Sequence, residues 1–272
     1  MKEDLKKILA NLSKPIISKL HPYKDYYKGE ECYLFGDGIS IKWFELDAFN
    51  DKISIPCGYI GFHNDFSKLN VHEFFLCETW MFYPFLKTIT TPPYRLIQNK
   101  IQSLYKRELI KKYPDKKFFL NLSNYLTTRG ENIVYVFNDF YDQRLPNTFI
   151  TNQINALHGT LRFSITMAIY MGFRKINLVG YDYTHVPSRS HHWYEKGEGV
   201  FVDQNNYNKD YLKIANEFID ITTITLDGSS SYLNSITYKD YTGRDPIFKE
   251  NNAIIDEKYL KVLSSNPRYK IY

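Results

Sequence analysis

The chain has few cysteines and no long hydrophobic run. Its 272 residues include only three cysteines, Cys32, Cys57 and Cys77, and no two of them have the spacing of a metal site. Nowhere do about 18 apolar residues follow one another, and residues 1–20 lack the apolar core of a secretory signal. We therefore expect buried thiols and a cytoplasmic protein.

The chain also lacks a large excess of charge of one sign. Lys and Arg number 35 against 30 Asp and Glu, and the basic residues are spread over many segments. The absence of a dense basic stripe argues against nucleic-acid binding, whereas a mild excess suits an anionic ligand or an ordinary solvated surface. No Gly-x-Ser-x-Gly motif is present, which argues against a serine hydrolase.

Aromatic residues, in contrast, are abundant. They make up 17% of the chain, with 24 Tyr and 19 Phe. Tyrosines can stack on bases and sugars or donate to phosphate oxygens, although an AT-rich genome enriches tyrosine without any functional reason. Composition is therefore compatible with nucleotide or sugar binding but does not establish it.

Short apolar runs alternate with helical patterns along the chain. This alternation predicts an α/β fold, a single doubly wound and mainly parallel sheet of the Rossmann-like kind with a lid subdomain. The predicted strands are 31–35, 59–62, 74–77, 133–137, 175–179 and 221–226, and the predicted helices are 94–113, 159–171 and 210–219.

Three segments follow from this pattern. Residues 1–28 hold a basic amphipathic helix that either packs on the body or lies on an anionic membrane surface as a peripheral contact. Residues 29–235 form the α/β domain, with a lid at about 184–209. Residues 236–272 form an irregular C-terminal extension with a short helix over 256–263.

Polar residues follow several predicted strands, at the edge where open α/β sheets present their reactive groups. Gly36, Asp37 and Gly38 come directly after the first strand, and glycines there would let the backbone approach a ligand. The full dinucleotide fingerprint is missing, because no third glycine follows at the required spacing. The pattern predicts either a ligand-binding loop or a simple turn.

The stretch 158–194 carries the strongest chemical signal. A nearly uncharged helix begins at Gly159 and Thr160, where free amides and a hydroxyl could bind an anion. A buried strand over 175–179 then ends in Gly180 and Asp182 before a loop rich in Ser, His, Gly and Asn. The loop is long enough to be a mobile lid.

The lid contains the histidines that we expect to act as a base. Imidazole can take a proton near neutral pH, and we rank His192 first, His191 second and His185 third. The alternative to a catalytic role is a packed loop in which the imidazoles have hydrogen-bond partners within the protein. Tyr183 and Tyr194 are the expected donors to a leaving phosphate.

The order of these motifs resembles that of two related families. These are the bacterial lipooligosaccharide sialyltransferases, which use CMP-sialic acid, and the MptE-like proteins, named after 6-hydroxymethylpterin diphosphokinase. Residues 27–41 are similar to a strand ending in Gly-Asn-Gly-Pro-Ser-Leu, with Asp37 in place of Asn and Ile39 in place of Pro. Residues 172–183 are the closest match, and the likeness covers about 25–235.

The resemblance implies a GT-A-variant fold and a set of nucleotide contacts. Asn64 is similar in position to an asparagine that binds the nucleotide, Glu78 or Cys77 falls on a further asparagine, and Thr160 on a serine. Together with the glycine-rich loop, the expected nucleotide-binding residues are Gly36, Asp37, Gly38, Ser40, Asn64, Glu78, Gly159, Thr160, Gly180 and Asp182.

One departure from the sialyltransferases matters. They take their general base from a histidine just ahead of the helix that follows the lid, and residues 205–208 contain none. A tyrosine that steadies the leaving phosphate falls on Thr184. Either the His191–His192 pair supplies the base from an earlier part of the lid, or the donor and mechanism differ.

The sequence therefore predicts a bacterial glycosyltransferase, inverting and metal-independent. It would transfer a sialic acid or related 2-keto sugar from a CMP-activated donor to a cell-surface glycan or lipid-linked glycan, in lipooligosaccharide or capsule biosynthesis. No cofactor, no Mg²⁺, no nucleic acid and a homo-oligomer are expected. The alternatives are a diphosphokinase that uses ATP and Mg²⁺, or a non-catalytic nucleotide-sugar-binding module of a polysaccharide assembly complex.

Overall fold

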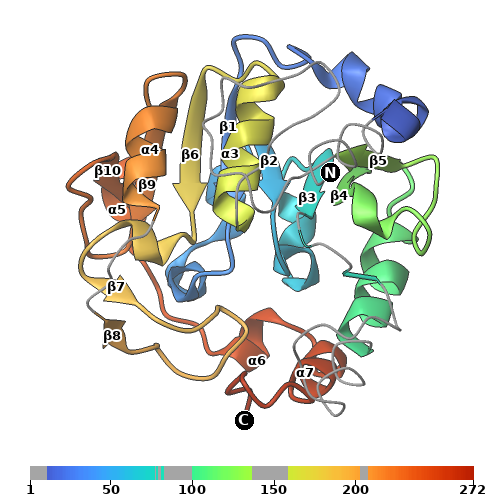
Figure 1. The fold of residues 1–272 in the computed structure, drawn as a ribbon. Coiled ribbons are helices and arrows are strands. Elements are labelled where there is room, and N and C mark those ends of the chain that lie inside the picture. Colours follow the sequence, from blue (N-terminus) through green and yellow to red (C-terminus); the bar gives the residue numbers. More distant parts are fainter. Residues whose placement is uncertain (1–10, 77, 79–80, 83–99, 137–158, 203–207) are drawn as a thin grey trace.

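Five parallel strands form the central sheet in a computed structural model of the chain (Figure 1). The structure describes residues 11–76, 78, 81–82, 100–136, 159–202 and 208–272. The strands lie in the order β10-β9-β6-β1-β2, and each strand is parallel to its neighbours. Their bounds are β1 Glu31–Phe35, β2 Ile53–Pro56, β6 Lys175–Val179, β9 Asp220–Thr225 and β10 Asn234–Thr237.

A second parallel sheet continues beside β2. It contains β3 (Glu73–Leu76), β4 (Lys117–Asn121) and β5 (Ile133–Val136), and it meets β2 at one bridge between Ser54 and Val71. The α/β class and the parallel sheet are thus confirmed, whereas the single sheet divides in two. Because β2 is short and ends in Pro56, which has no N–H to donate, its pairing with the next strand is limited.

The strand order reverses between β1 and β6. The chain runs from β1 to β2 on one side, and β6, β9 and β10 lie on the other side of β1. Such a reversal is the switch point at which open α/β sheets bind ligands, outside the carboxyl ends of the strands. Figure 1 shows the β6 arrowhead pointing toward β7 (Ser188–Arg189), β8 (Phe201–Val202) and the C-terminal helices.

Both faces of the sheet are buried. Along β1, Cys32 and Leu34 face one apolar layer and Tyr33 and Phe35 face the other, as the two-residue period of a strand requires. The first layer includes α3 (Thr160–Tyr170) and α4 (Lys209–Ala215). A strand that is covered on both faces has a continuous apolar sequence. The observed bounds of β1 and β6 therefore agree with the predicted ones.

The remaining helical elements are short. The helices are α5 (Tyr238–Thr242), α6 (Asn251–Ile254) and α7 (Glu257–Leu263), with residues 100–105 helical and leading into the π-helix η6 (Lys106–Ile110). The 3-10 turns are η1 (Ser18–Tyr23), η2 (Ile39–Trp43), η3 (Leu46–Phe49), η4 (Ile60–Phe62), η5 (Phe66–Lys68), η7 (Leu122–Asn124) and η8 (Asp182–Thr184).

The strand predicted at 59–62 is wrong. These residues form η4, and the second strand of the chain lies earlier, at β2. Phe62 is buried against the ring of Tyr105, at 5.8 Å between ring centroids, and a Cβ on Gly61 would lie 2.7 Å from Leu109. The run is apolar because it packs under the helical residues 100–110. A short segment that is buried in this way has the same apolar sequence pattern as a buried strand, although it pairs with no other strand.

The two ends of the described chain pack on the body. Ile17 and Leu20 are fully buried in the layer that contains α3, which supports the packing interpretation of the amino-terminal segment; residues 1–10 lie outside the described part. Residues 236–272 are not a loose tail, because α6 and α7 contribute Ile254, Leu260 and Leu263 to the core. No helix in the described ranges is long and apolar enough to cross a membrane.

Candidate functional site

The loops after β1 and β6 pack directly on each other at the switch point. The Gly36 amide donates to the carbonyl of Val179 at 2.9 Å, and the Gly38 amide donates to that of Gly180 at 2.8 Å. A Cβ on Gly38 would lie 2.4 Å from the Gly180 oxygen. These glycines therefore allow two protein loops to approach each other, whereas we expected them to admit a ligand.

Asp182 and Ser40 form a second tie between the same loops. The Asp182 Oδ2 accepts from the Ser40 amide at 2.9 Å and its Oδ1 accepts from the Ser40 hydroxyl at 2.5 Å. Both residues are buried. Burial raises the pKa of Asp182, and the two bonds from Ser40 act against this rise. Because both oxygens have a protein partner, the structure gives these two expected nucleotide contacts a structural role.

Asp37 connects three segments. Its carboxylate accepts from the Tyr59 amide, just after β2, at 2.9 Å and from the Trp193 indole, in the lid, at 3.1 Å. Its carbonyl also accepts from the Trp193 amide at 3.1 Å. Burial raises the pKa of Asp37, while the charge of His192 and these hydrogen bonds lower it. Asp37 thus sits where β1, β2 and the lid meet.

Glu78 lies close enough to Asp37 for the two charges to interact, and Thr160 forms a hydrogen bond with Glu78. Glu78 follows β3 and is exposed, but protein atoms crowd its carboxyl and desolvation raises its pKa; the charge of Asp37 raises it further and a hydrogen bond from Thr160 lowers it. Thr160 begins α3, whose N-cap Gly159 supplies no side-chain cap. The first amides of α3 therefore have the positive end of the helix near Glu78.

Asn64 lies apart from this group. Its amide donates to the carbonyl of Ile254 at 2.8 Å and its side chain donates to that of Ala253 at 3.3 Å. Both partners belong to α6, so these two hydrogen bonds direct Asn64 to the C-terminal helices and not to Asp37, Glu78 or Thr160. The structure therefore brings together Asp37, Glu78, Thr160 and the loop of Asp182, but not Asn64.

His192 and Glu195 form an oriented pair in the lid. The His192 Nδ1 lies 2.6 Å from Glu195 Oε1, which also accepts from the His192 amide at 3.0 Å. Glu195 Oε2 accepts from the Lys270 amide at 2.9 Å. The Glu195 side chain is 3% exposed and that of His192 is 42% exposed. A buried carboxylate thus holds a reachable imidazole with Nδ1 as donor and Nε2 as acceptor.

The surroundings of His192 also set its protonation. Burial lowers the pKa of His192, but the hydrogen bond to Glu195 and the charges of Asp37, Glu195 and Asp182 outweigh this, so the pKa lies above its usual value. An imidazole with this pKa can both take and return a proton near neutrality. It lies close enough to Asp37 for each charge to act on the other.

The other two candidate histidines lack such an arrangement. His191 has a left-handed backbone with φ of 77°, and His185 is buried with a pKa that burial lowers. The Nδ1 atoms of both are buried without a hydrogen-bond partner. Of the three, only His192 has a hydrogen bond to a carboxylate among the described residues.

The centre of the lid is part of the core. Trp193 and Tyr194 are fully buried, and the Tyr194 ring stacks on His192 at 5.0 Å between centroids. The predicted mobile lid therefore does not describe residues 192–195, which the aromatic packing and Asp37 hold in place. Tyr183 is half-buried against Tyr181, at 6.0 Å between ring centroids.

Two residues that contact His192 were not expected from the sequence. Glu195 could have been found from its spacing, because the side chains of a histidine and a glutamate three residues later can meet across a turn. Tyr269 packs edge-on against both His192 and Tyr194, at 5.4 and 5.1 Å between centroids, and carried no sequence signal. Among the described residues, no three His, Cys, Asp or Glu side chains are grouped to hold a metal ion.

Comparisons with known proteins give a distant structural likeness. No protein-family model and no curated protein matches the chain. Two similar solved structures are of the sialyltransferase Cst-II. One is a Tyr-to-Phe variant in complex with CMP, with 12% identity and a TM-score of 0.45 over 87% of this chain and 99% of that one. The other is a complex with a trisaccharide acceptor and CMP, with 14% identity and a TM-score of 0.45 over 87% of this chain and 100% of that one. A third is CstII from Campylobacter jejuni with CMP as substrate analogue (13%, 0.41, 88% and 99%).

Proposed function

We propose that this protein is an inverting glycosyltransferase that moves a sialic acid or related 2-keto sugar from a CMP donor to a glycan hydroxyl. The observation that carries the proposal is the His192–Glu195 pair at the switch point of the sheet. A base fixed by a buried carboxylate beside a ligand-binding edge is the arrangement that proton abstraction requires.

His192 would act as the general base. Its Nε2 takes the proton of the acceptor hydroxyl as the hydroxyl oxygen bonds to the anomeric carbon of the sugar. The bond from that carbon to the phosphate oxygen breaks, and CMP leaves with the electron pair. Glu195 keeps the ring in one tautomer and stabilises the imidazolium that forms, because its charge lies 2.6 Å from Nδ1.

The residues around Asp37 would hold the donor. The first amides of α3 and the Thr160 hydroxyl can bind the phosphate, which removes the need for a metal ion at that position. Glu78, whose pKa is raised, can accept from or donate to the ribose or the base. Tyr183, which is half-buried, remains the proposed donor to the leaving phosphate, whereas Tyr194 is fully buried and would act by supporting the His192 ring.

The other residues that we expected to contact the nucleotide would instead hold the loops around the site in position. Asp37, Ser40 and Asp182 bond to protein groups, and Gly36, Gly38 and Gly180 allow the two loops to meet. Their substitution would displace the loops that surround the donor. We therefore assign nucleotide contact to Glu78, Thr160 and the amides after Gly159.

A thermal-shift comparison tests the donor. CMP is expected to raise the melting temperature without Mg²⁺, because at a hundredfold excess over Kd it adds about 2.7 kcal/mol to the unfolding free energy. UDP and GDP are expected to raise the melting temperature less. A response to ATP alone, dependent on Mg²⁺ and followed by AMP release, would identify a diphosphokinase instead. Donor binding with neither transfer nor hydrolysis would identify a binding module.

A further inference from the structure

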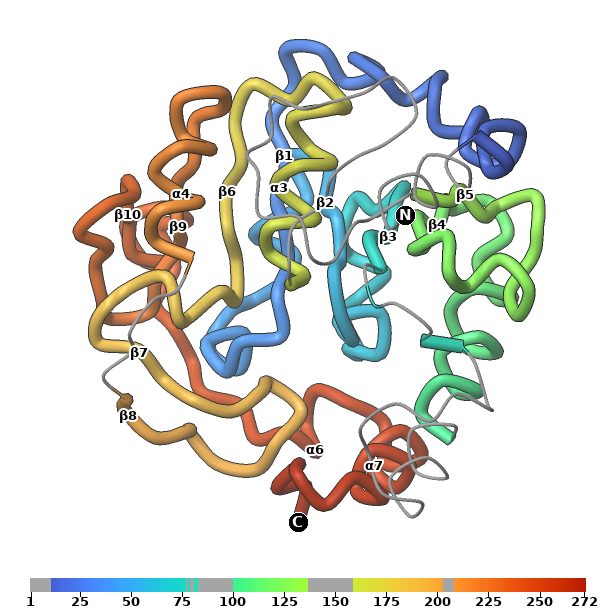
Figure 2. The backbone as a smooth tube through the Cα atoms, viewed as in Figure 1, coloured from blue at the N-terminus to red at the C-terminus, as the bar shows by residue number. Residues whose placement is uncertain are grey.

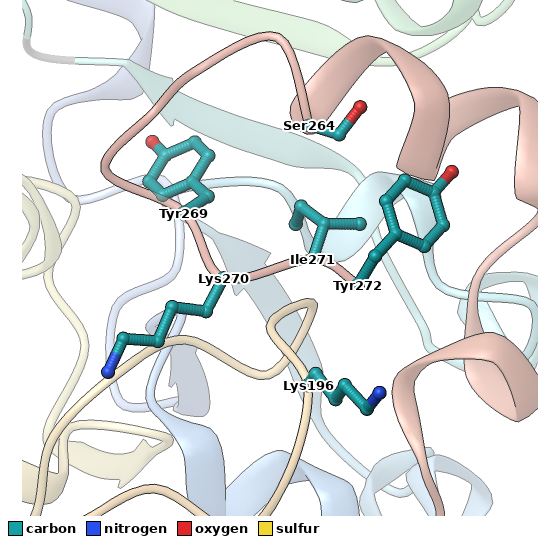
Figure 3. A pocket seen from close by; sticks show the side chains of 6 residues that line it. All are labelled: Lys196, Ser264, Tyr269, Lys270, Ile271 and Tyr272. Carbon is teal, nitrogen blue, oxygen red and sulfur yellow. The ribbon is translucent and has the colours of Figure 1, made fainter.

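The pocket formed by the last residues of the chain lies outside the site described above. It has a volume of about 360 Å³ and is lined by Lys196, Ser264, Tyr269, Lys270, Ile271 and Tyr272. The Tyr269 ring packs against His192, so it separates this pocket from the imidazole. Figure 3 shows the two lysines extending in different directions, and Tyr272 donates to the Glu257 carboxylate at 2.9 Å. The charges of this pocket therefore select no ligand, whereas an unused polar group lies at the donor end of the site.

That group is the side-chain amide of Asn121, the last residue of β4. Asn121 is 3% exposed, and its Oδ1 accepts from the backbone amide of Ser123 at 2.9 Å. This bond fixes the orientation of the side chain, because a backbone N–H has to face an oxygen. The Nδ2 atom is therefore the other end, and it is buried without a hydrogen-bond partner in the described part of the chain. A buried donor is costly to leave unpaired, and a bound ligand can supply its acceptor.

The strand directs this amide to the face that α3 covers. Phe119, two residues earlier, packs in the layer that contains α3, whereas Leu120 packs in the opposite layer. Because side chains alternate along a strand, Asn121 faces the same side as Phe119. Its register partner on β5, Val136, belongs to that layer as well. Asn121 thus faces the helix whose first amides we assign to the donor.

Asn121 also lies at the level of the amino end of α3. Phe75 of β3 contacts both Phe119, at 5.4 Å between ring centroids, and Phe163 of α3, at 6.1 Å. The helix ends beside the residues that precede β1, so it begins at the carboxyl edge of the parallel strands. From this aromatic contact, Asn121 lies further along its strand toward that edge, and Thr160 lies about one turn nearer to the same edge. The unpaired amide and the start of the helix are therefore both at the edge where ligands bind.

Asn124 holds Asn121 next to Glu78. Its side chain is fully buried, and its Nδ2 donates to the carbonyl of Glu78 at 3.0 Å and to that of Asn121 at 3.3 Å. Its Oδ1 accepts from the Phe82 amide at 3.0 Å, so the segment after β3 is held at two points. The Glu78 side chain forms its hydrogen bond with Thr160, at the start of α3. A carboxylate acceptor and an unpaired amide donor thus come from neighbouring residues and face the same helix.

We infer that Asn121 is a specificity residue of the donor site and that, together with Glu78, it recognises the cytosine of the nucleotide. The inference rests on the proposed function, because it adds a contact to the donor site of that reaction. The Glu78 carboxylate accepts from the N4 amino group of cytosine, and the Asn121 Nδ2 donates to the neighbouring N3. Uracil presents a carbonyl oxygen and an N–H at these two positions, so acceptor would face acceptor and donor would face donor.

Nucleotide binding by the full chain tests the selectivity that this pair would give. Isothermal titration calorimetry with CMP, UMP, AMP and GMP measures it without any acceptor sugar. CMP is expected to bind about tenfold more tightly than UMP, since the mismatched base leaves polar groups unpaired. In the NMR spectrum of the ¹⁵N-labelled chain, CMP should also shift the side-chain amide signal of Asn121. Equal affinity for CMP and UMP would contradict the inference.

The variant Asn121→Ser removes the donor and keeps the cap. A serine hydroxyl can still accept from the Ser123 amide, but the Nδ2 donor is gone. CMP binding is expected to weaken about fivefold while UMP binding stays the same, so the CMP-to-UMP affinity ratio falls. Glu78→Gln should lower this ratio as well, because the glutamine amide can donate to the uracil oxygen. Asn234→Ser, at the exposed first residue of β10, removes an amide elsewhere and should keep the wild-type ratio.

The outcomes separate this inference from the proposed function. An unchanged affinity ratio in Asn121→Ser would overturn the inference, while CMP binding would still support the proposed donor. If that variant does not fold, Glu78→Gln decides, because Glu78 is exposed, and an unchanged ratio there would overturn the inference. Adenine offers the same order of amino group and ring nitrogen on a larger base. Binding of AMP with no binding of CMP would therefore overturn both the cytosine assignment and the proposed function.

Discussion

At the scale of single residues, the role of each polar side chain in the site depends on its hydrogen-bond partner. The carboxylate of Asp182 could be predicted to end a buried strand, but whether it meets a ligand or a backbone amide depends on which donors lie nearby. In this fold the Ser40 amide and hydroxyl reach it first. His192 was identifiable because imidazoles are rare and chemically distinctive, whereas its orientation by Glu195 required the turn over 192–195.

The His192–Glu195 pair gives a prediction for the dependence of turnover on pH. The base has to be unprotonated, so kcat/KM rises as pH increases through the pKa of His192. Glu195→Gln removes the charge that raises this pKa, so the rising limb of the profile should move to lower pH. An NMR titration of the His192 ring should move in the same direction.

Glu198→Gln is the matched control for this variant. Glu198 lies three residues beyond Glu195, its side chain is 61% exposed, and it approaches Arg189 only at 3.9 Å. It should leave the profile of the protein unchanged. A pH profile that moves equally in both variants, or in neither, would mean that Glu195 does not set the protonation of His192.

At the scale of elements, the strands and helices that are buried on every side were the predictable ones. The sequence predicted β1, β6 and the limits of α3 to within a residue or two, because burial on both faces leaves uninterrupted apolar runs. It failed at 59–62, where burial comes from packing under Tyr105. It also missed α6, whose Asn251 contacts the lid, since a helix of four residues leaves little periodic signal, whereas the helix predicted over 256–263 is α7.

The turn η2 is joined to the lid by a buried lysine. Lys42 has no exposed side-chain area, and its Nζ donates to the carbonyls of Glu195 and Gly197 at 2.7 and 2.6 Å and to Glu250 at 2.6 Å. Burial lowers the pKa of Lys42 while Glu250 raises it. Lys42 therefore fixes the loop that carries Glu195 relative to the loop after β1.

Replacing Lys42 should affect both stability and catalysis. Lys42→Met leaves two carbonyls and one carboxylate without their donor, and the expected loss is about 3 kcal/mol of unfolding free energy. Turnover should fall further than stability alone explains, because Glu195 loses its support. Lys239→Met removes a surface pair with Asp245 and should change neither the denaturant midpoint nor the rate. A Lys42 variant as stable and as active as the wild type would contradict this role.

At the scale of the whole molecule, the C-terminal segment packs against the lid at the switch point of the sheet. The lid and the C-terminal segment lie side by side below the sheet in Figure 2, and Asn251 joins them. Its side-chain amide donates to the carbonyls of Tyr194 and Ile271, both at 3.0 Å. The site is thus completed by residues more than 150 positions from the first glycine loop, a long-range arrangement that periodicity cannot reveal.

This junction can be weakened at one residue. Asn251→Ala leaves two buried carbonyls unsatisfied and should lower the unfolding free energy by about 2 kcal/mol. Since Tyr269 and Lys270 lie beside Ile271, the same change should reduce turnover while CMP binding persists. Asn252→Ala, at the neighbouring exposed position, should be close to wild type in chemical denaturation. Equal behaviour of the two variants would show that the C-terminal segment does not depend on Asn251.

The central claim is that His192 is the base of a sugar transfer from CMP. The most direct measurement compares His192→Ala with His191→Ala in the transfer of sialic acid from CMP-sialic acid to a glycan acceptor, with CMP affinity measured in parallel. We expect His192→Ala to lose about a hundredfold or more of its rate with CMP affinity unchanged, and His191→Ala to retain most of its rate. Transfer at the wild-type rate by the His192 variant would contradict the account.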